Sequence, residues 1–318
     1  MINQATAIGA DIGHDSIRIA VVRMKGEIIS KSEVPLKSKQ SRDYLVEMLT
    51  DSVREIRLKA AGQGINPICI GVAAKGFIDH KSGVILGPDQ GIQDWNNVAL
   101  ARLVSNGTGL PAYVGNDANM MTIAEHQFGV AKGLNNIVFV ALRTGIGGGL
   151  IINGRLYRGV NNAGGEIGQM IINYDNGISN LGIRGSFEHL ASASAVVRRY
   201  REEQGGQPVK KNISCREIFE LSYAGSSPAV KVISENAEIV GIGVANLISI
   251  FAPEMIVLGG GMSQARDSYI SAILKSAFEN SLANCRAEVR IERARLGSDA
   301  SLLGSAFYAL TRLAGKNI

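Results

Sequence analysis

The residues best suited to catalysis lie between positions 114 and 169. Asp117 follows a short apolar run and has amides on either side of it in the sequence VGNDANMM. Further along, the turn TGIGGG at 144–149 joins two apolar stretches, and a polar loop carrying Glu166 follows. A carboxylate can orient or deprotonate a hydroxyl, and the unhindered N–H groups of a glycine-rich turn can approach phosphate oxygens. The combination predicts a phosphoryl-transfer site.

The elements before this site predict a mixed sheet with flanking helices. Apolar runs on both sides of Gly13-His14-Asp15 indicate a β-hairpin whose first strand ends at Asp11, and a third strand follows at 26–29. The strand expected at 112–114 brings Asn116 and Asp117 to its carboxyl end. With a strand at 68–73 and helices at 41–61, 98–106 and 119–130, the order is β-β-β-α-β-α-β-α.

A second hairpin, at 136–152, has the same pattern as the first: an apolar strand, a glycine turn and another apolar strand. The segment GRLY at 154–157 corresponds to GEII at 26–29. This repetition indicates a pseudo-duplication with a ligand cleft between two halves. A short strand at 255–258 opens onto Gly259, Gly260 and Gly261, which suits the close approach of a flat ligand or a phosphate. The remaining pattern predicts helices at 192–204, 214–222, 228–251, 265–282 and 300–314.

Composition excludes several other classes of protein. With 46% hydrophobic and 19% charged residues and a net charge of +5, the 318-residue chain has the balance of a soluble protein with a formed core. Its three scattered cysteines form no disulfide framework or zinc motif and suit a reducing cytoplasm. No signal region or membrane-length apolar run is present. The basic cluster at 198–201 precedes two glutamates and indicates a solvated helix face rather than a nucleic-acid site.

Five motifs together resemble the ROK family of repressors, unassigned reading frames and sugar kinases, within the larger actin-like, sugar-kinase and heat-shock ATPase fold. The resemblance covers about 7–312. The motifs are NDAN at 116–119, TGIGGG at 144–149, GRLYRG at 154–159, GGEIG at 164–168 and PEMIVLGGG at 253–261.

This resemblance implies a two-domain α/β fold of the actin-like, sugar-kinase (ribonuclease H-like) class, with a cleft between the domains. The smaller domain is expected at 1–117 plus 300–318, and the larger at 118–299.

The resemblance also implies roles for particular residues. Asp117 matches the general base that takes the proton from the acceptor hydroxyl. Sugar contacts would come from Gly76, Asn116, Glu166, Gln169 and Glu188. These side chains suit hydroxyl groups, which both donate and accept hydrogen bonds.

The cofactors implied are ATP and Mg²⁺. Thr144 and Gly145 would meet the ATP phosphates, and the three glycines at 259–261 would line the adenosine side. Asp11 would act through magnesium or its water shell, and Gly13 would belong to the first phosphate loop.

The first phosphate loop departs from the family pattern. The kinases have Asp-x-Gly-Gly-Thr-Lys, whereas this chain has His14 and Asp15 in place of the second glycine and the threonine. A further carboxylate facing phosphates costs electrostatic energy unless a cation offsets it. Arg143 also replaces a glycine beside the second phosphate turn, where it would assist or block phosphate binding.

The zinc segment departs as well. Gln169 replaces the histidine that binds sugar and zinc, and the three cysteines of the family motif are replaced by Ser179, Leu181 and Ser186. Serine and leucine cannot replace thiolate ligands, so we predict no structural zinc. Packing through Leu181 and Phe187 is expected to hold this loop.

Two functional hypotheses follow. The first is a cytoplasmic sugar kinase that is glucokinase-like and acts on the 6-hydroxyl of an aldohexose or N-acetylhexosamine. The second is a non-catalytic sugar-sensing regulator that keeps the sugar site and binds ATP poorly, which the altered loop at 11–16 favours. The first strand begins near Ala7, which leaves no room for an N-terminal helix-turn-helix, so no nucleic-acid partner is expected. A homodimer is expected from the resemblance.

Simpler interpretations remain for individual residues. Asp117 would serve only as a helix N-cap, and Glu166 only as a solvated loop acid. A regulatory pseudokinase acting through protein contacts is a third functional class. The sugar itself is left open by the sequence.

Overall fold

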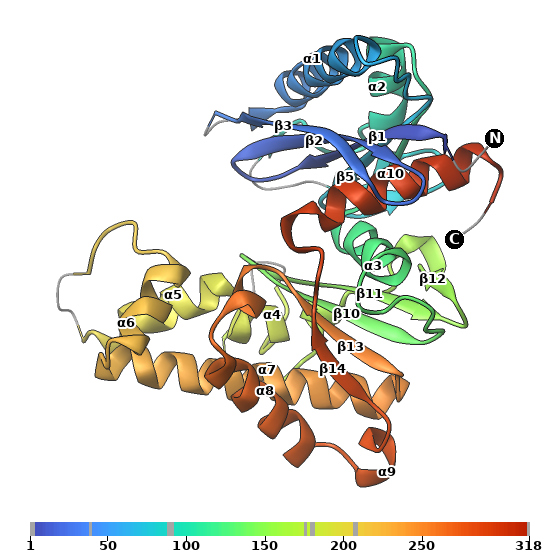
Figure 1. Ribbon diagram of the computed structural model, residues 1–318. Helices are drawn as coiled ribbons and strands as arrows, with labels where there is room; N and C mark the ends of the chain where they lie inside the picture. The colour runs from blue at the N-terminus through green and yellow to red at the C-terminus, as the bar shows by residue number, and fades with distance from the viewer. Residues whose placement is uncertain are drawn as a thin grey trace. The chain divides into compact units, whose positions relative to one another are not determined.

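The computed structural model describes residues 4–37, 40–87, 92–174, 177–178, 182–205 and 209–316. The chain divides into two compact units (Figure 1). The first comprises Met1–Gly133, Arg155–Gly164 and Leu296–Ile318, and the second comprises Leu134–Gly154 and Gly165–Arg295. The predicted domain boundary after residue 117 differs from this division, which keeps the following helix in the first unit.

The first unit is built on a five-stranded sheet with the strand order β3-β2-β1-β5-β9. The first three strands form an antiparallel meander, and β1, β5 and β9 run parallel. Parallel strands end at the same edge of a sheet, so the residues after β1, β5 and β9 share one edge. The strands are β1 (Thr6–Ile12), β2 (Ser16–Arg23), β3 (Ile28–Pro35), β5 (Ile70–Ala74) and β9 (Ala112–Asn116).

Helices cover both faces of this sheet, with α1 and α2 on one side and α10 on the other (Figure 1). The α10 backbone lies directly against the sheet, because a Cβ added at Gly9 or Gly71 would overlap the carbonyl of Leu302 or Ser305. This close approach fixes α10 beside the end of β1. The helices are α1 (Arg42–Ala61), α2 (Leu100–Thr108), α3 (Asp117–Gln127) and α10 (Ala300–Leu313).

Short elements complete this unit. Two small sheets pair β4 with β8 and β6 with β7. The elements are β4 (Gln40–Ser41), β6 (Ile78–Asp79), β7 (Val84–Ile85), β8 (Ile92–Gln93) and the 3₁₀ turns η2 (Val160–Asn162) and η5 (Gly297–Asp299).

The second sheet has the order β12-β11-β10-β13-β14. Its β10–β11 pair is an antiparallel hairpin, and β10, β13 and β14 run parallel. Both sheets therefore contain the antiparallel hairpin that the repeated sequence pattern predicts, and in each sheet the first hairpin strand also lies beside two parallel strands. The strands are β10 (Ile137–Leu142), β11 (Ile146–Ile152), β12 (Arg155–Tyr157), β13 (Met255–Gly259) and β14 (Arg290–Arg293).

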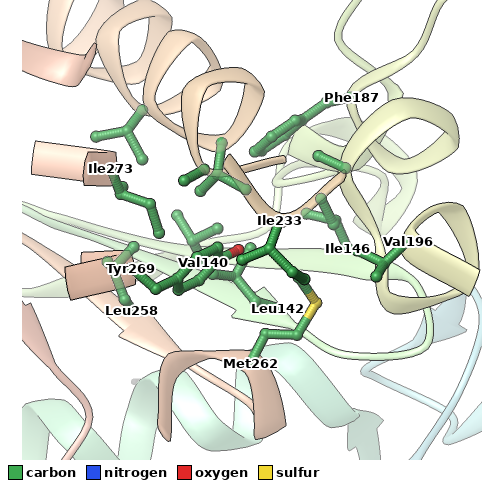
Figure 2. Close-up of a cluster of buried hydrophobic side chains, with 14 of the residues drawn as sticks. Val140, Leu142, Ile146, Phe187, Val196, Ile233, Leu258, Met262, Tyr269 and Ile273 are labelled. Atoms are coloured by element: carbon green, nitrogen blue, oxygen red, sulfur yellow. The ribbon is translucent and has the colours of Figure 1, made fainter. Parts of the chain in front are cut away.

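The second unit carries its helices around an apolar core that Figure 2 shows in part. Ile146, Phe187 and Val196 belong to this cluster of buried side chains. The elements are η3 (Ile167–Gln169), α4 (Phe187–Ala191), α5 (Ala193–Glu203), α6 (Cys215–Tyr223), α7 (Ser227–Phe251), η4 (Gly261–Gln264), α8 (Asp267–Glu279) and α9 (Ala283–Arg286).

In the described part of the chain, one helix, α7, is long and apolar enough to cross a membrane by length and composition. Its apolar residues pack in the core of the second unit, where Val240, Val244 and Leu247 are fully buried. A Cβ at Gly241 would overlap the side chain of Ser276 on α8, so the two helices pack closely at this point. This is the burial of a core helix. All three cysteines of the chain are free thiols.

Candidate functional site

Asp11 lies at the end of β1 and is only 1% exposed. The register of the hairpin pairs it with Arg18, whose Nη2 donates a hydrogen bond to the Asp11 carboxylate. Ser301 Oγ, at the start of α10, donates to the same carboxylate at 2.9 Å. Arg18 Nη1 also donates to the Ser298 carbonyl at 2.5 Å. The Asp11 charge is thus matched by a guanidinium within the first unit.

The hairpin turn after Asp11 closes on itself. Gly13 N donates to Ser16 O at 2.9 Å, and a Cβ at Gly13 would lie 2.8 Å from that same oxygen. The side chains of His14 and Asp15 are 76% and 95% exposed and contact each other at 2.8 Å. Gln40 Nε2 holds the turn from outside by donating to His14 O at 2.7 Å. The two residues that depart from the family pattern therefore lie in solvent.

Asn116 and Asp117 mark the junction of β9 and α3. The N-cap is Asn116, whose Oδ1 accepts from Asn119 N at 3.2 Å, so the interpretation of Asp117 as only the cap is wrong. Asn116 Nδ2 donates to Gly76 O at 3.2 Å, which ties the loop after β5 to the end of β9. Asp117 lies in the first turn, where the positive end of the helix dipole favours a carboxylate.

A small cavity of about 20 Å³ lies beside this junction. Asn119 Oδ1 is buried there without a hydrogen-bond partner among the described residues. A space of this size holds roughly one water molecule. The lining consists mostly of polar residues from several elements, namely Ile78, His80, Gly115, Asn116, Asn119, Met120, Leu156, Arg158, Asn162 and Tyr308. Among these lining residues, the sequence motifs imply a ligand role for Asn116 alone.

His80 is held firmly in that lining. Its Nδ1 donates to Asn162 Oδ1, and its carbonyl accepts from Arg312 Nη1 at 2.6 Å. Burial lowers the pKa of His80, while the hydrogen bond with Asn162 opposes the shift. Burial also lowers the pKa of the nearby Arg158, whose guanidinium stacks over the Tyr308 ring at 5.8 Å from its centroid. The cavity wall therefore favours a neutral imidazole.

In the second unit, backbone hydrogen bonds join the turn Arg143–Ile146 to the first turn of α5. Ala193 N donates to Arg143 O at 2.9 Å, and Ser194 N donates to Thr144 O at 3.3 Å. In a trans peptide group the C=O and N–H point in opposite directions. The N–H groups of Thr144 and Gly145 therefore point away from α5. Two adjacent outward donors at a turn are suited to anion binding.

The next N–H, that of Ile146, points to a different partner. It donates to Glu188 Oε2 at 2.9 Å, and Gln169 Nε2 donates to Glu188 Oε1 at 3.5 Å. Gln169 Oε1 is buried and has no hydrogen-bond partner among the described residues. A Cβ at Gly145 would overlap Glu188 Oε2, so glycine is needed there for the carboxylate to approach. Thr144, Gly145, Gln169 and Glu188 thus form one cluster.

Glu166 reaches this cluster through the backbone. It precedes η3, and Gln169 N donates to Glu166 O at 3.0 Å, so both residues lie on a single 3₁₀ turn. Ile167 anchors the turn by packing where a Cβ at Gly148 would otherwise lie. The Glu166 side chain is exposed, whereas Gln169 is partly buried.

The segment that resembles the family zinc motif is held by other means. Ser186 is fully buried, and its hydroxyl caps α4 by accepting from His189 N at 3.3 Å. Phe187 is fully buried against Gly243 of α7, and its N–H donates to Met170 O at 2.7 Å. Ser179 and Leu181 lie outside the described residues. Within the described ranges, no group of three or more His, Cys, Asp or Glu side chains could hold a metal.

The three glycines at the end of β13, Gly259 to Gly261, differ from one another. A Cβ at Gly259 would overlap the Phe139 ring, and one at Gly260 would overlap the carbonyl of Leu142. These two glycines are required by the packing of β13 against β10. Only a Cβ at Gly261 would meet nothing within 4 Å, so this position alone leaves open space for a ligand.

The structure therefore groups the candidate residues at one sheet edge in each unit. In the first unit, Asp11 and Gly13 lie at the end of β1, and Asn116 and Asp117 lie at the end of β9, with Gly76 hydrogen-bonded to Asn116. In the second unit, the turn after β10 and the glycines after β13 are neighbours in the same way. Arg18, Ser301 and the acceptor at Asn119 are additions that the sequence analysis lacks.

Known proteins resemble this chain over nearly its whole length. The family model described as ROK family matches residues 7–312. A glucokinase of Halalkalibacterium halodurans is 29% identical over 308 residues, covering 93% of this chain and 92% of that protein. A xylose repressor of Caldicellulosiruptor bescii is 29% identical over 306 residues, covering 93% of this chain and 76% of that protein.

Among solved structures, a ROK family glucokinase from Streptomyces griseus in complex with glucose and AMPPNP superimposes with a TM-score of 0.83. It is 29% identical, and the match covers 96% of this chain and 99% of that one. The two-domain actin-like fold expected from the motifs is thereby confirmed. The chain belongs to the ROK family.

Proposed function

We propose that this protein is an ATP-dependent sugar kinase that transfers the γ-phosphoryl group of ATP to the 6-hydroxyl of an aldohexose or N-acetylhexosamine. The observation that carries the proposal is the turn Arg143–Ile146, whose Thr144 and Gly145 N–H groups point away from α5 as a pair of donors for phosphate oxygens. The glucokinase relatives, one of them solved with glucose and AMPPNP, support it.

In this proposal Asp117 takes the proton from the sugar hydroxyl, whose oxygen forms a bond to the γ-phosphorus as the bond to the β,γ-bridging oxygen breaks. ADP leaves with that bridging oxygen. The carboxylate suits this role because it lies in the first turn of α3 and the N-cap position is taken by Asn116. Sugar hydroxyls would be bound by Gly76, Asn116, Glu166, Gln169 and Glu188.

The two proposed cofactors fit this chain unequally. ATP suits the donors of the Thr144 turn and the open space at Gly261. Mg²⁺ does not fit Asp11 in the observed arrangement, because Arg18 and Ser301 already occupy its carboxylate. We therefore assign Asp11 no metal-binding step. A cytoplasmic homodimer without nucleic-acid or membrane partners and without structural zinc completes the proposal.

An ADP-release assay with a panel of hexoses and N-acetylhexosamines tests the proposal. Turnover that depends on one of these sugars and on Mg-ATP is the expected result. The absence of ADP release with every sugar, together with the absence of AMPPNP binding by calorimetry, would refute the kinase.

The pairing of Asp11 with Arg18 favours a second candidate, a non-catalytic sugar-sensing regulator. The guanidinium of Arg18 neutralises the carboxylate of Asp11, which leaves little negative charge to attract the magnesium ion of Mg-ATP. The relatives of this chain include xylose repressors as well as glucokinases. Calorimetry that finds sugar binding without AMPPNP binding would select this function.

A further inference from the structure

We infer that Glu125 is a positioning residue, which fixes the helix that carries Asp117 to the segment that completes the surroundings of Asp11. Glu125 lies in the last turn of α3, and Asp117 lies in the first. The inference deepens the proposed function and rests on it for the role of Asp117 as the base. Glu125 acts through α3 and not on the substrate.

Glu125 is fully buried, and both oxygens of its carboxylate accept a backbone N–H group. Oε1 accepts from Leu296 N at 2.8 Å, and Oε2 accepts from Val130 N at 3.0 Å. Glutamate is rarely buried, and the negative end of the helix dipole disfavours a carboxylate in the last turn. Charge-assisted hydrogen bonds, which are among the stronger kinds, offset this cost. A Cβ at Gly129 would lie 1.8 Å from Oε2, so glycine leaves room for the carboxylate.

The residues 296–301, here called the 296–301 segment, are bound to each of the first three strands of the sheet. Leu296 N, at the start of this segment, donates to Glu125. Glu125 therefore joins α3 to the strands that hold Asp11 and Arg18. The three contacts with the strands are Ser298 O with Arg18 on β2 at 2.5 Å, Asp299 with Lys31 on β3 at 3.2 Å, and Ser301 Oγ with Asp11 on β1 at 2.9 Å.

A second contact holds α3 nearer its first turn. A Cβ at Gly304 would lie 1.8 Å from the Met120 carbonyl oxygen, so the backbones of α10 and α3 touch there. Two contacts along a helix determine the direction of its axis, whereas one contact allows it to pivot. With a rise of about 1.5 Å per residue, Glu125 lies about 7.5 Å beyond Met120, and Asp117 lies about 4.5 Å before it. A shift of about 1 Å at Glu125 would thus move Asp117 by about 0.6 Å.

Displacement of the base on this scale affects the chemical step more than it affects sugar binding. A misplaced base loses rate because proton transfer needs hydrogen-bond reach. Sugar binding is shared among several side chains, and Asn116 is also held from outside α3 by Gly76 O. A residue that only stabilises the fold would leave both kcat and the sugar Kd of the folded protein unchanged. A lowered kcat with an unchanged sugar Kd therefore identifies positioning.

The experiment compares Glu125→Gln with the wild type and uses Glu254→Gln as its matched control. Glu254 also accepts two backbone N–H groups, those of Asn135 at 2.6 Å and Asn136 at 2.7 Å, but both bond to its Oε2. A glutamine side chain keeps one acceptor oxygen. It can therefore replace Glu254 in full, whereas at position 125 it leaves one of the two N–H groups facing an amide NH₂ group.

The ADP-release assay gives kcat, calorimetry gives the Kd of the sugar that is turned over, and hydrogen exchange gives the protection of the Leu296 and Val130 amides. For Glu125→Gln we expect kcat to fall about tenfold and the sugar Kd to stay within about threefold. One of the two amides should exchange at least about tenfold faster. Glu254→Gln should match the wild type in all of these measurements.

A double-mutant cycle tests whether Glu125 and the surroundings of Asp11 belong to one frame. Urea denaturation measures the unfolding equilibrium constants of Glu125→Gln, of Ser301→Ala and of the double variant. Both residues bind the 296–301 segment, so the two effects should depart from additivity by about threefold or more in that constant. The pair of Glu125→Gln with Lys275→Met, an exposed residue of α8 in the second unit, should be additive.

Unchanged kcat in Glu125→Gln would overturn the positioning role, as would an equal loss of kcat in Glu254→Gln. Unchanged exchange of both amides, or additivity with Ser301→Ala, would overturn the link between α3 and the 296–301 segment. If Glu125→Gln fails to fold, Ser301→Ala tests the link from the other end. Its Leu296 amide should exchange faster, and unchanged protection would refute the link.

If the wild type releases no ADP with any sugar, the proposed function fails. Hydrogen exchange and the double-mutant cycle then decide, without any assay of activity, whether Glu125 holds the 296–301 segment.

Discussion

Arg18 and Asp11 face each other across the β1–β2 hairpin, and the guanidinium of one matches the buried charge of the other. The pair is anchored at both ends, since Ser301 binds the carboxylate and the Ser298 carbonyl accepts from Arg18. An ion pair therefore links β1 and β2 beside the turn at 13–15.

Replacing Arg18 with Met should destabilise the protein by about 3 kcal/mol, because Asp11 would remain as a buried charge without its cation. Urea denaturation measures the loss. Adding Asp11→Asn to the Met variant should restore part of it. The matched control is Arg23→Met, which removes an exposed ion pair with Glu27 and should change stability by no more than about 0.5 kcal/mol. Equal losses in the two single variants would contradict the assigned pairing.

Replacing Asp117 with Asn should lower kcat at least about 100-fold while the sugar Kd changes little, because the amide keeps the hydrogen-bonding shape and cannot take a proton. The ADP-release assay and calorimetry supply the two quantities. Asp51→Asn, on the exposed face of α1, serves as the control and should keep full activity. Activity retained by the Asp117 variant would rule out this residue as the base.

Acid should destabilise the first unit through His80. Burial lowers its folded-state pKa below that of the unfolded chain, so the unfolded state binds the proton first as pH falls. The contribution of His80 to the free energy of unfolding is complete above the pKa of the unfolded state, which is near 6.5. That contribution is lost as the pH falls through the lowered pKa of the folded state. The thermal midpoint should thus fall between pH 7.5 and 5.

His80→Asn should flatten that pH dependence. Part of the slope should remain, because burial lowers the pKa of His189 in the same direction. An identical slope in the variant and the wild type would show that His80 is not the group responsible.

Replacing Gly71 with Ala should cost at least about 3 kcal/mol, because the new Cβ would overlap the Ser305 carbonyl and push α10 off the sheet. Thermal and urea denaturation both report this. Gly62→Ala is the control, since its backbone is in the right-handed region and its Cβ would make only ordinary contacts at 3.6 Å and beyond.

Treatment with a strong metal chelator should leave the fold unchanged. The zinc-like segment is held by the Ser186 cap, by the packing of Phe187 and by hydrogen bonds such as Gly185 N to Gly177 O at 2.8 Å. Metal analysis of the purified protein should find well below one zinc per chain, and a strong chelator should not shift the thermal midpoint. Stoichiometric zinc, or unfolding on chelation, would require ligands that the substituted motif does not offer.

Much of the fold follows from apolar periodicity and glycine placement. The predicted helix at 41–61 begins at Arg42, because Ser41 caps it, and ends at Ala61. The two hairpins and the parallel strands β5, β9 and β13 also lie where their apolar runs predict them. Strand β14 could not be found this way, because its residues alternate between exposed and partly buried and include three charges in RIER. This segment forms a strand because it pairs with β13, not because of a strand pattern in its own residues.

The candidate site was less predictable because its chemistry depends on pairings between distant residues. Motif matching places Asp11 in a phosphate loop, yet Ser301 and Ser298, which complete its surroundings, come from the other end of the chain. The Arg18 partner was available in principle, since a turn at 13–15 sets residue 11 opposite residue 18. Nothing in the sequence indicates that Ile146 N–H donates to Glu188, or that Asn119 Oδ1 has no partner among the described residues.

The attachment of Arg143 and Thr144 to the start of α5 has a consequence for communication within the second unit. Each of the two peptide groups carries a donor at one end and an acceptor at the other, and a hydrogen bond at one end polarises the group and strengthens the bond at the opposite end. An anion that binds the Thr144 and Gly145 N–H groups would therefore tighten the bonds from Ala193 and Ser194. Through these two polarised peptide groups, an anion bound at the turn would strengthen the attachment of the first turn of α5.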